Sequence, residues 1–217
     1  MGDFSRIYKT ELSDRQLMAF WRLVQASGRG RSIGFDAPPM DGPAFCRWMR
    51  RPGVHPWLVA WRGVPMALYW LSGLKGRSAE VHFCLLPCGV RRLDVPREAV
   101  PREAVPAGAL SRSGRQTAEG GGVSGGQKVR LPLVRAAALF GLASVLWEAP
   151  EQGFRIDTLI GITPASNAPA LALVRSLGAK EHGTVPGLCW LYEARLNVPG
   201  VLNTFDRETV PQRAASL

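Results

Sequence analysis

Cysteine and histidine are scarce in this sequence. Its 217 residues include four cysteines, Cys46, Cys84, Cys88 and Cys189, and three histidines. Cys84 and Cys88 have no cysteine or histidine partners at the spacing of a zinc site, so we expect no metal site. So few cysteines suit a reducing compartment, which predicts a cytoplasmic protein.

Long hydrophobic runs are also missing. The first residues, MGDFSRIYKTELSD, are polar and do not resemble a signal peptide. The most apolar window, residues 131–147, contains Pro132 and Arg135 and has 17 residues, where a membrane span needs roughly 20. We interpret it as a buried core helix, with a membrane helix as the alternative, and expect no membrane partner.

Lysine is rare, although the chain is basic. There are 4 lysines against 23 arginines, and the formal net charge is +10. A basic surface favours nucleic-acid binding, because it releases counterions from phosphates. However, residues 91–130 carry eight basic and four acidic residues, and the only tight cluster elsewhere is Arg47, Arg50 and Arg51. Solvated charge is the simpler explanation, so nucleic-acid binding is an alternative that rests on charge alone.

The first expected helix begins with a capping signature. Ser13 is its N-cap, Gln16 completes a capping box, and Leu12 can pack on Leu17 as a hydrophobic staple. The apolar stripe of this helix consists of Leu17, Phe20, Trp21 and Val24. Gly28 and Gly30 are expected to end it.

A second short helix and three strands are expected next. Residues 42–51 predict the helix, which stops before Pro52. Apolar runs at 57–61, 64–71 and 79–86 predict strands joined by short turns. Such turns connect antiparallel neighbours, so we expect an antiparallel meander.

Residues 88–128 break every periodicity. They contain the pentad VPREA twice, at 95–99 and 100–104, and five glycines between positions 120 and 126. Proline at every fifth position removes backbone donors, and clustered glycine is entropically costly to order. We interpret 88–128 as an insertion that is mostly disordered.

Strand and helix signals alternate after the apolar window at 131–147. A strand is expected at 156–162. A helix follows it, with Ser166 as N-cap, Pro169 in the first turn and Gly178 as the left-handed residue beyond its end.

The last part of the sequence predicts paired strands and a tail. Runs at 179–184 and 188–196 are expected to be strands with a turn at 185–187. From residue 197 the sequence is polar, so we expect a loosely attached tail over 197–217.

The helix after residue 162 carries a family resemblance. Asn167, Ala170, Leu173, Val174 and Gly178 stand in the frame Asn-x-x-Ala-x-x-Leu-Tyr-x-x-x-Gly-Phe, with valine in place of the tyrosine and Ala179 in place of the final aromatic residue. This frame resembles that of the GNAT superfamily of N-acetyltransferases, and the element order over 12–88 and 129–196 is the GNAT order. His82-Phe83 and GITPASN at 161–167 are similar to phage- and prophage-encoded members.

The resemblance implies an α/β (α+β) fold. We expect one domain over residues 1–196, with a GNAT-like mixed, mainly antiparallel sheet of six to seven strands flanked by about four helices. It also implies the transfer of an acetyl group from acetyl-CoA to an amine, carried by a small molecule or a peptide. A homodimer is left open.

The cofactor site implied by the resemblance lies between the fourth and fifth strands. Acetyl-CoA is expected near Leu85, Leu86 and Asn167, although a capping role explains Asn167 equally well. The usual glycine-rich phosphate loop before the central helix is missing. Its nearest equivalent is Gly125-Gly126 with Lys128, and the alternative there is a flexible hinge.

A base for the amine is expected on the strand at 79–86. Glu80, His82 and Cys84 share one face because side chains alternate along a strand. Glu80 or His82 could take the proton directly or through a water. The alternatives are a surface carboxylate and a core histidine. The family's acid, the helix tyrosine, is Val174 here, and Tyr192 is either its substitute or a packed sheet residue.

A non-catalytic protein is the chief rival interpretation. The missing phosphate loop and Val174 favour a GNAT-like binding or structural module of phage or prophage origin. The sequence therefore leaves open whether catalysis survives on this fold.

Overall fold

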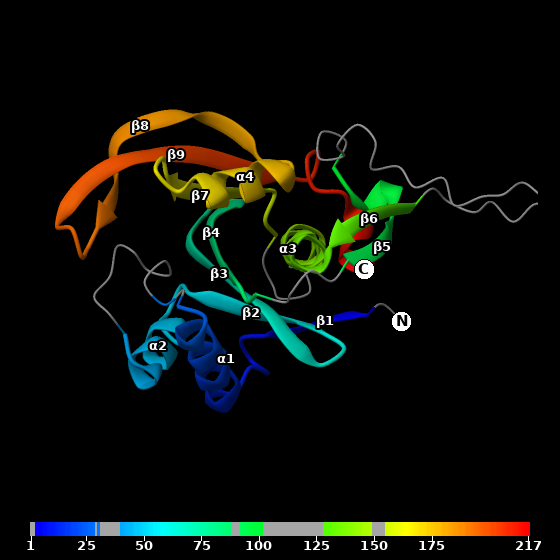
Figure 1. Cartoon of the computed structure of the whole chain (residues 1–217), viewed down its shortest axis with the longest axis horizontal. Helices are drawn as coiled ribbons and strands as arrows, with labels where there is room; N and C mark the ends of the chain where they lie inside the picture. Colours follow the sequence, from blue (N-terminus) through cyan, green and yellow to red (C-terminus); the bar gives the residue numbers. More distant parts are fainter. Residues whose placement is uncertain (1–2, 29, 31–39, 88–91, 102–127, 149–154) are drawn as a thin grey trace, which may run out of the picture.

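The structure is a computed structural model of the chain and describes residues 3–28, 30, 40–87, 92–101, 128–148 and 155–217. Seven strands form one sheet in the order β1-β2-β3-β4-β7-β9-β8 (Figure 1). Their bounds are β1 Phe4–Tyr8, β2 His55–Trp61, β3 Val64–Lys75, β4 Ser78–Leu85, β7 Thr158–Pro164, β8 Lys180–Leu191 and β9 Leu196–Asp206. β4 and β7 run parallel, and the other neighbouring pairs are antiparallel. The expectation of a mixed, mainly antiparallel sheet is confirmed.

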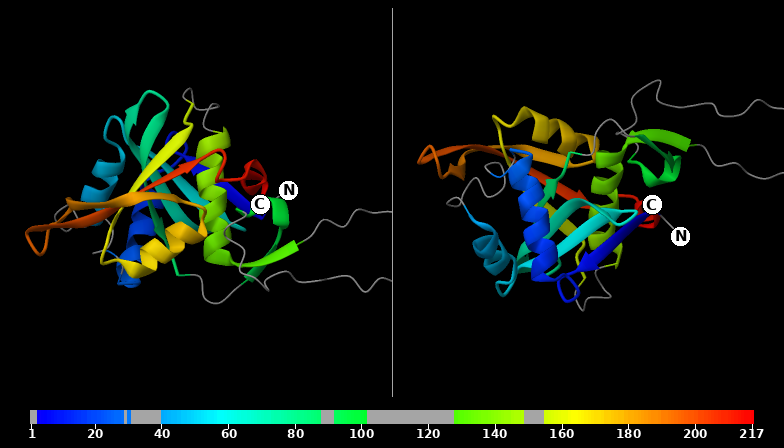
Figure 2. Two further views of the ribbon diagram at one scale, coloured as in Figure 1. Left: turned by 90° about the horizontal axis from the view of Figure 1, so that it is seen from above. Right: turned by 60° about the horizontal axis from the view of Figure 1, so that its bottom comes forward.

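Four α-helices within the described ranges cover parts of both faces of this sheet: α1 Asp14–Ala26, α2 Gly42–Met49, α3 Leu133–Ala143 and α4 Ala168–Ser176. α1 and α2 pack on one face of β2–β4, where Leu58, Leu68 and Trp70 are buried. α3 lies on the opposite face (Figure 2). The sheet therefore separates two hydrophobic cores, and the larger one contains α3.

The central helix α3 crosses directly over β3. The hydroxyl of Tyr69 donates a hydrogen bond to the carbonyl of Ala138 at 2.9 Å. Gly141 lies so close to the same ring that a Cβ there would come within 2.2 Å of Tyr69 Cε2. Burial raises the pKa of Tyr69 far above its usual value, so the phenol is neutral. The expectation of a buried core helix is confirmed, although the helix begins at Leu133 rather than Leu131.

The start of α1 follows the sequence prediction. Ser13 and Gln16 form the capping box, and Leu12 and Leu17 are buried. Gly28 has a positive φ of 72° just beyond the helix end, a conformation that favours glycine.

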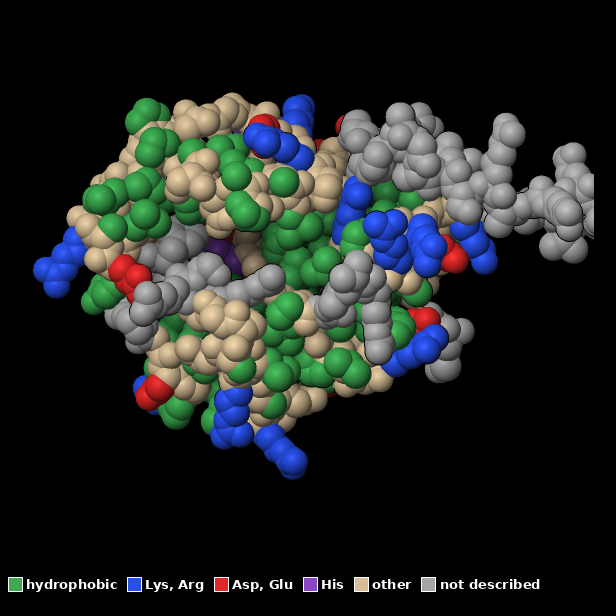
Figure 3. Space-filling view, viewed as in Figure 1, with side chains coloured by type: hydrophobic (Ala, Val, Ile, Leu, Met, Phe, Trp, Pro, Cys, Tyr) green, Lys and Arg blue, Asp and Glu red, His purple; other side chains and the backbone are tan. Residues whose placement is uncertain are grey.

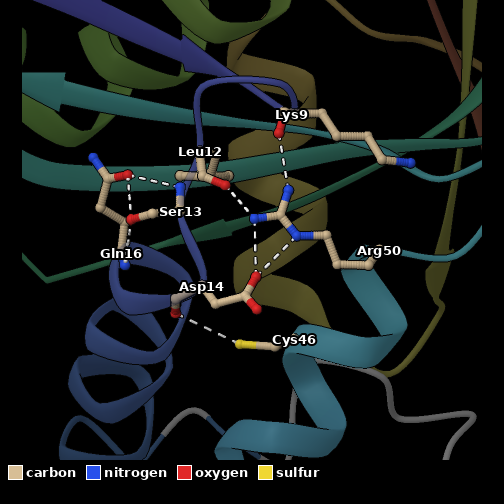
Figure 4. A network of polar contacts seen from close by, with 7 residues as sticks. All are labelled: Lys9, Leu12, Ser13, Asp14, Gln16, Cys46 and Arg50. Carbon is tan, nitrogen blue, oxygen red and sulfur yellow. Dashed lines mark hydrogen bonds and ion pairs between the residues drawn. The ribbon is translucent and has the colours of Figure 1, made fainter.

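Arg50, the C-cap of α2, fixes both helices to the loop after β1. Its guanidinium donates to the carbonyl of Lys9 at 2.9 Å, to the carbonyl of Leu12, and to the carboxylate of Asp14 at 2.9 Å (Figure 4). Two of these acceptors are main-chain groups that would otherwise need another donor. Arg50 therefore serves the fold, which weakens the arginine cluster at 47–51 as a polyanion site.

Two elements correct the sequence analysis near the N-terminus and in the insertion. β1 lies in the polar stretch before α1, for which no strand was predicted. β5 Arg92–Pro96 pairs with β6 Lys128–Pro132, and Val95, Ala99 and Val129 are buried. The expectation of disorder is therefore wrong for 92–100, because alternate apolar residues give this hairpin a face that packs on the larger core. The remaining residues, 88–91 and 102–127, lie outside the described ones.

The C-terminal strands also differ from the prediction. β8 continues through residues 185–187, where a change of register takes up the extra residues, and the turn lies at 192–195. β9 inserts between β7 and β8, and Phe205 on it is buried. The expected tail over 197–217 is therefore wrong, because Val201, Asn203 and Phe205 at alternate positions of β9 are buried. No helix among the described residues is long and apolar enough to cross a membrane.

Candidate active site

The sheet opens where its two parallel strands separate. β4 and β7 pair only at Ser78–Thr158, Ala79–Leu159 and Glu80–Ile160. Beyond these pairs β7 continues against β9, and β4 continues against β3. The two strands therefore diverge, and a pocket of about 150 Å³ lies in the gap.

This pocket is lined from both faces of the sheet. Val81 and Phe83 of β4 belong to the side of the larger core, as does Val174 of α4. Trp70 and His82 line the pocket from the side of α1 and α2. The pocket therefore connects the two faces, so that two reactants entering from opposite sides can meet in it. The space-filling view shows a hollow between the C-terminal strands and the helical side (Figure 3).

A chain of polar groups ends at the pocket on the side of α1 and α2. Ser72 Oγ donates to Glu80 Oε2 at 3.3 Å and lies 3.0 Å from Nε2 of His82. A hydroxyl has one proton, so Ser72 accepts from Nε2–H while it donates to the carboxylate. This assigns the Nε2–H tautomer to neutral His82. The carboxylate itself lies 3.8 Å from Nε2.

Stacking fixes the ring of His82. It lies parallel to Trp70, with an interplanar angle of 5° and a centroid distance of 5.3 Å. The side chain of His82 is 41% exposed and that of Glu80 is 51% exposed, whereas Cys84 is buried beneath the helices. The predicted shared face of Glu80, His82 and Cys84 is present. His82 lines the pocket, and Glu80 is connected to His82 by hydrogen bonds through Ser72.

The start of α4 forms another wall of the pocket. Asn167 is the N-cap, and its Oδ1 accepts a hydrogen bond from the backbone N–H of Ala170 at 3.2 Å. The expectation of Ser166 as N-cap is wrong by one residue. Gly178 has a positive φ of 87° after the helix, as expected from its position.

Asn203 is a pocket residue that the sequence analysis missed. It lies on β9 beside Gly161 of β7, is fully buried, and lines the pocket. Its Nδ2 donates to the carbonyl of Val201 at 3.1 Å, which fixes Oδ1 as an acceptor. Oδ1 has no hydrogen-bond partner in the described part of the chain. A buried, unpaired carbonyl oxygen costs about 1–3 kcal/mol. The available signal was the alternation in residues 201–205, where Asn203 shares a face with Val201 and Phe205.

Other predicted site residues lie outside the pocket. Tyr192 is in the turn between β8 and β9, 41% exposed, and does not line the pocket. Its prediction as the acid placed it on the last strand, and the structure corrects that placement. Tyr69 is nearer, stacked on Phe83 at 5.4 Å, but its hydroxyl is committed to Ala138.

The predicted cofactor residues are spread over several elements. Leu85 is buried and continues the row of Val81 and Phe83 along β4. Leu86 lines a separate apolar pocket next to Leu133, and its backbone N–H donates to the carbonyl of Met66 at 2.8 Å. Lys128 is exposed on β6, which separates residues 125–126 from the first turn of α3. Gly125 and Gly126 lie outside the described residues.

Comparisons with known proteins show likeness in structure. No protein-family model and no curated protein matches the sequence. RimJ of Mycobacterium smegmatis in complex with CoA-disulfide has a TM-score of 0.58 at 15% identity, over 94% of this chain and 83% of that one. An acetyltransferase of Salmonella typhimurium that modifies the N-terminal serine of ribosomal protein L7/L12 has a TM-score of 0.59 at 8% identity, over 94% and 95%.

A third match was solved with a ligand. YncA of Salmonella typhimurium with its cofactor acetyl-CoA has a TM-score of 0.54 at 10% identity, over 94% of both chains. At these identities the likeness establishes architecture rather than activity. The chain has the fold of the GNAT acetyltransferases.

Proposed function

We propose that this chain is an N-acetyltransferase that transfers an acetyl group from acetyl-CoA to an amine. The observation that carries the proposal is the pocket through the sheet, with the His82–Ser72–Glu80 chain on one side. The thioester occupies the side of α3 and α4, and the amine approaches from the side of α1 and α2. The similar structures solved with acetyl-CoA or CoA-disulfide support this choice of cosubstrate.

His82 is the proposed base because it lines the pocket, whereas Glu80 does not. The neutral amine attacks the thioester carbonyl, and the ring of His82 takes the proton that the nitrogen loses. The resulting imidazolium donates from Nε2 through Ser72 to the Glu80 carboxylate, which stabilises its charge. The carbon–sulfur bond then breaks, and the departing sulfur takes the proton back from the imidazolium. This route needs neither a tyrosine at Val174 nor Tyr192.

Acetyl-CoA is proposed to lie between β4 and β7, near Leu85 and the N-terminus of α4. β7 beyond Ile160 pairs with β9 alone among the described strands, so its other edge can hydrogen-bond an extended ligand. The phosphates are assigned to the region before α3, whose first turn has no side-chain cap. Whether Gly125, Gly126 and Lys128 bind them stays a prediction.

The finer features of the proposal rest on the sequence. The acceptor is an amine. Two of the similar structures are named as acting on spermidine and on a ribosomal protein's N-terminal serine, which suggests the first compounds to test. The phage-type resemblance of residues 82–83 and 161–167, a cytoplasmic location and a homodimer stay predictions.

A binding and turnover experiment tests the proposal. Melting with millimolar acetyl-CoA should raise the unfolding temperature, since a ligand at a hundred times its Kd adds about 2.7 kcal/mol to stability. Release of CoA thiol is then followed with spermidine, with a peptide that begins with serine, and with small alkylamines. Binding without CoA release from any amine would favour the non-catalytic module. The absence of any shift with acetyl-CoA and other acyl-CoAs would contradict the enzyme proposal.

A further inference from the structure

Asn203 combines complete burial with an unused acceptor. Its Nδ2 is committed to the carbonyl of Val201, and Oδ1 has no partner among the residues that the structure describes. The other residues on this face of β9, Val201 and Phe205, are buried and apolar. An apolar residue would pack there without leaving a polar atom unpaired. A requirement of the fold therefore does not explain the asparagine.

The surroundings of Asn203 leave open space beside its buried side chain. Asn203 lines the pocket, and its neighbour on β7 is Gly161. A Cβ at Gly161 would meet no atom within 4 Å, so the space next to Asn203 is open at this point. The missing partner can therefore be a group that enters the pocket.

The chemistry of the walls restricts that group. Besides the polar residues His82, Thr163 and Asn167, the pocket has apolar walls that include Phe83, Leu173, Val174 and Phe205. Such walls suit an uncharged N–H donor flanked by hydrocarbon rather than an ammonium ion. Asn203 also lies on the sheet face of the larger core, whereas His82, the proposed base, lies on the opposite face. A donor beside Asn203 thus belongs to the thioester cosubstrate and not to the attacking amine.

We propose that Oδ1 of Asn203 accepts a hydrogen bond from an amide N–H of the pantetheine arm of the bound acyl-CoA. The arm carries two secondary amides separated by methylene groups. One amide N–H can meet the single acceptor, and the methylene groups can pack on the apolar walls. The bond sets how deep the thioester lies relative to His82. This inference rests on the proposed function.

The test combines a protein change with a ligand change. Asn203→Leu removes the acceptor and keeps the number and branching of the side-chain heavy atoms. Ser144→Ala is the matched control, because Ser144 is buried, its Oγ also has no hydrogen-bond partner among the described residues, and it does not line this pocket. The ligands are acetyl-CoA and two analogues in which one or the other pantetheine amide N–H is replaced by an ester oxygen. Binding is measured by calorimetry, and the melting temperature is measured without ligand.

The expected result has three parts. The wild type binds one of the two ester analogues about 5–10-fold more weakly than acetyl-CoA, as expected for one hydrogen bond. Asn203→Leu binds acetyl-CoA about 5–10-fold more weakly and no longer distinguishes it from that analogue. Ser144→Ala keeps the discrimination. Asn203→Leu melts within about 4 °C of the wild type without ligand.

Several outcomes would overturn the inference. Equal wild-type affinity for acetyl-CoA and both analogues would do so without any variant, even if Asn203→Leu fails to fold. So would full discrimination by Asn203→Leu. If the wild type binds no acetyl-CoA at all, the proposed function fails together with the inference, whereas normal binding without discrimination removes the inference alone.

Discussion

The two halves of the sheet are built in different ways. In β1–β4 each strand pairs with its neighbour in sequence, and helices cover both faces. In the half formed by β7, β9 and β8, the last strand enters between two earlier ones. His82, the proposed base, lies at the edge of the first half, and Asn203 lies inside the second. Residues positioned by neighbouring segments can be predicted from the local sequence pattern. Residues positioned by β9, which enters between two strands formed earlier in the chain, cannot.

The largest expected effect tests the contribution of the first half to the site. His82→Asn should lower kcat/KM by about 10²–10⁴-fold, the usual range for a general base, with the best amine of the panel. Glu80→Gln should cost less, because Glu80 acts through Ser72. His182→Gln is the matched control, since His182 lies in the other half and bonds Thr204 at 2.8 Å outside the pocket. Full activity in His82→Asn would show that the base is elsewhere.

The next effect concerns the helix that packs across the first half. In Gly141→Ala the new Cβ would lie 2.2 Å from the ring of Tyr69, whose hydroxyl is already fixed by Ala138. Overpacking of this kind costs about 1–3 kcal/mol. Urea unfolding should show that loss as a lower midpoint with an unchanged slope.

Gly161→Ala provides the control for Gly141→Ala. It adds the same methyl group in the second half, where the Cβ would meet nothing within 4 Å. Its stability should stay within about 1 kcal/mol of the wild type, on the stabilising side. Equal destabilisation by both substitutions would contradict the close packing of α3 on Tyr69.

A smaller effect separates Asn167 from Asn203 within the second half. Asn167→Ala removes the N-cap of α4 and should cost about 0.5–2 kcal/mol of stability, whereas Asn167→Ser keeps a capping oxygen and should recover most of it. Because Oδ1 of Asn167 is committed to Ala170, Asn167→Ser should bind acetyl-CoA within about twofold of the wild type. Recovered stability with weakened binding would instead support the cofactor contact that the family resemblance implies.

Local rules predicted much of the fold. The capping box at Ser13, the buried stripe of α1 and the meander β2–β3–β4 depend on residues close in sequence. The face shared by Glu80 and His82 follows from strand alternation in the same way. Each of these features needs only a short window, because the interacting groups lie within a few residues or across a tight turn.

Long-range pairing explains what the sequence analysis missed. β1 has two adjacent polar residues, Ser5 and Arg6, and becomes a strand through its register with β2, about 50 residues away. The hairpin of β5 and β6 joins segments more than 30 residues apart. β9 is half-polar because one face lies away from the core, which makes it resemble a tail. Asn203 was therefore assigned to that tail, because its burial depends on a strand order that no local window contains.

The smallest effect compares one histidine from each half. His55, at the start of β2, lies 3.1 Å from the hydroxyl of Tyr8 through Nδ1. Burial, and to a lesser extent the charge of Lys9, hold the pKa of His55 below its usual value. As pH falls below about 6.5, the unfolded chain takes up a proton before the folded one does, so this histidine lowers stability from there down to its folded pKa.

The difference in the free energy of unfolding between wild type and His55→Gln should therefore be largest at pH 7.5 and become smaller as the pH approaches 5. The difference should change by at most about 1.4 kcal/mol per pH unit. Urea unfolding at steps of half a pH unit measures this difference. The contributions of the carboxylates cancel, because both proteins contain the same ones. His182→Gln, from β8, controls for the loss of an imidazole ring. If the free energies of unfolding of wild type and His55→Gln depend on pH in the same way, His55 does not contribute to the loss of stability in acid.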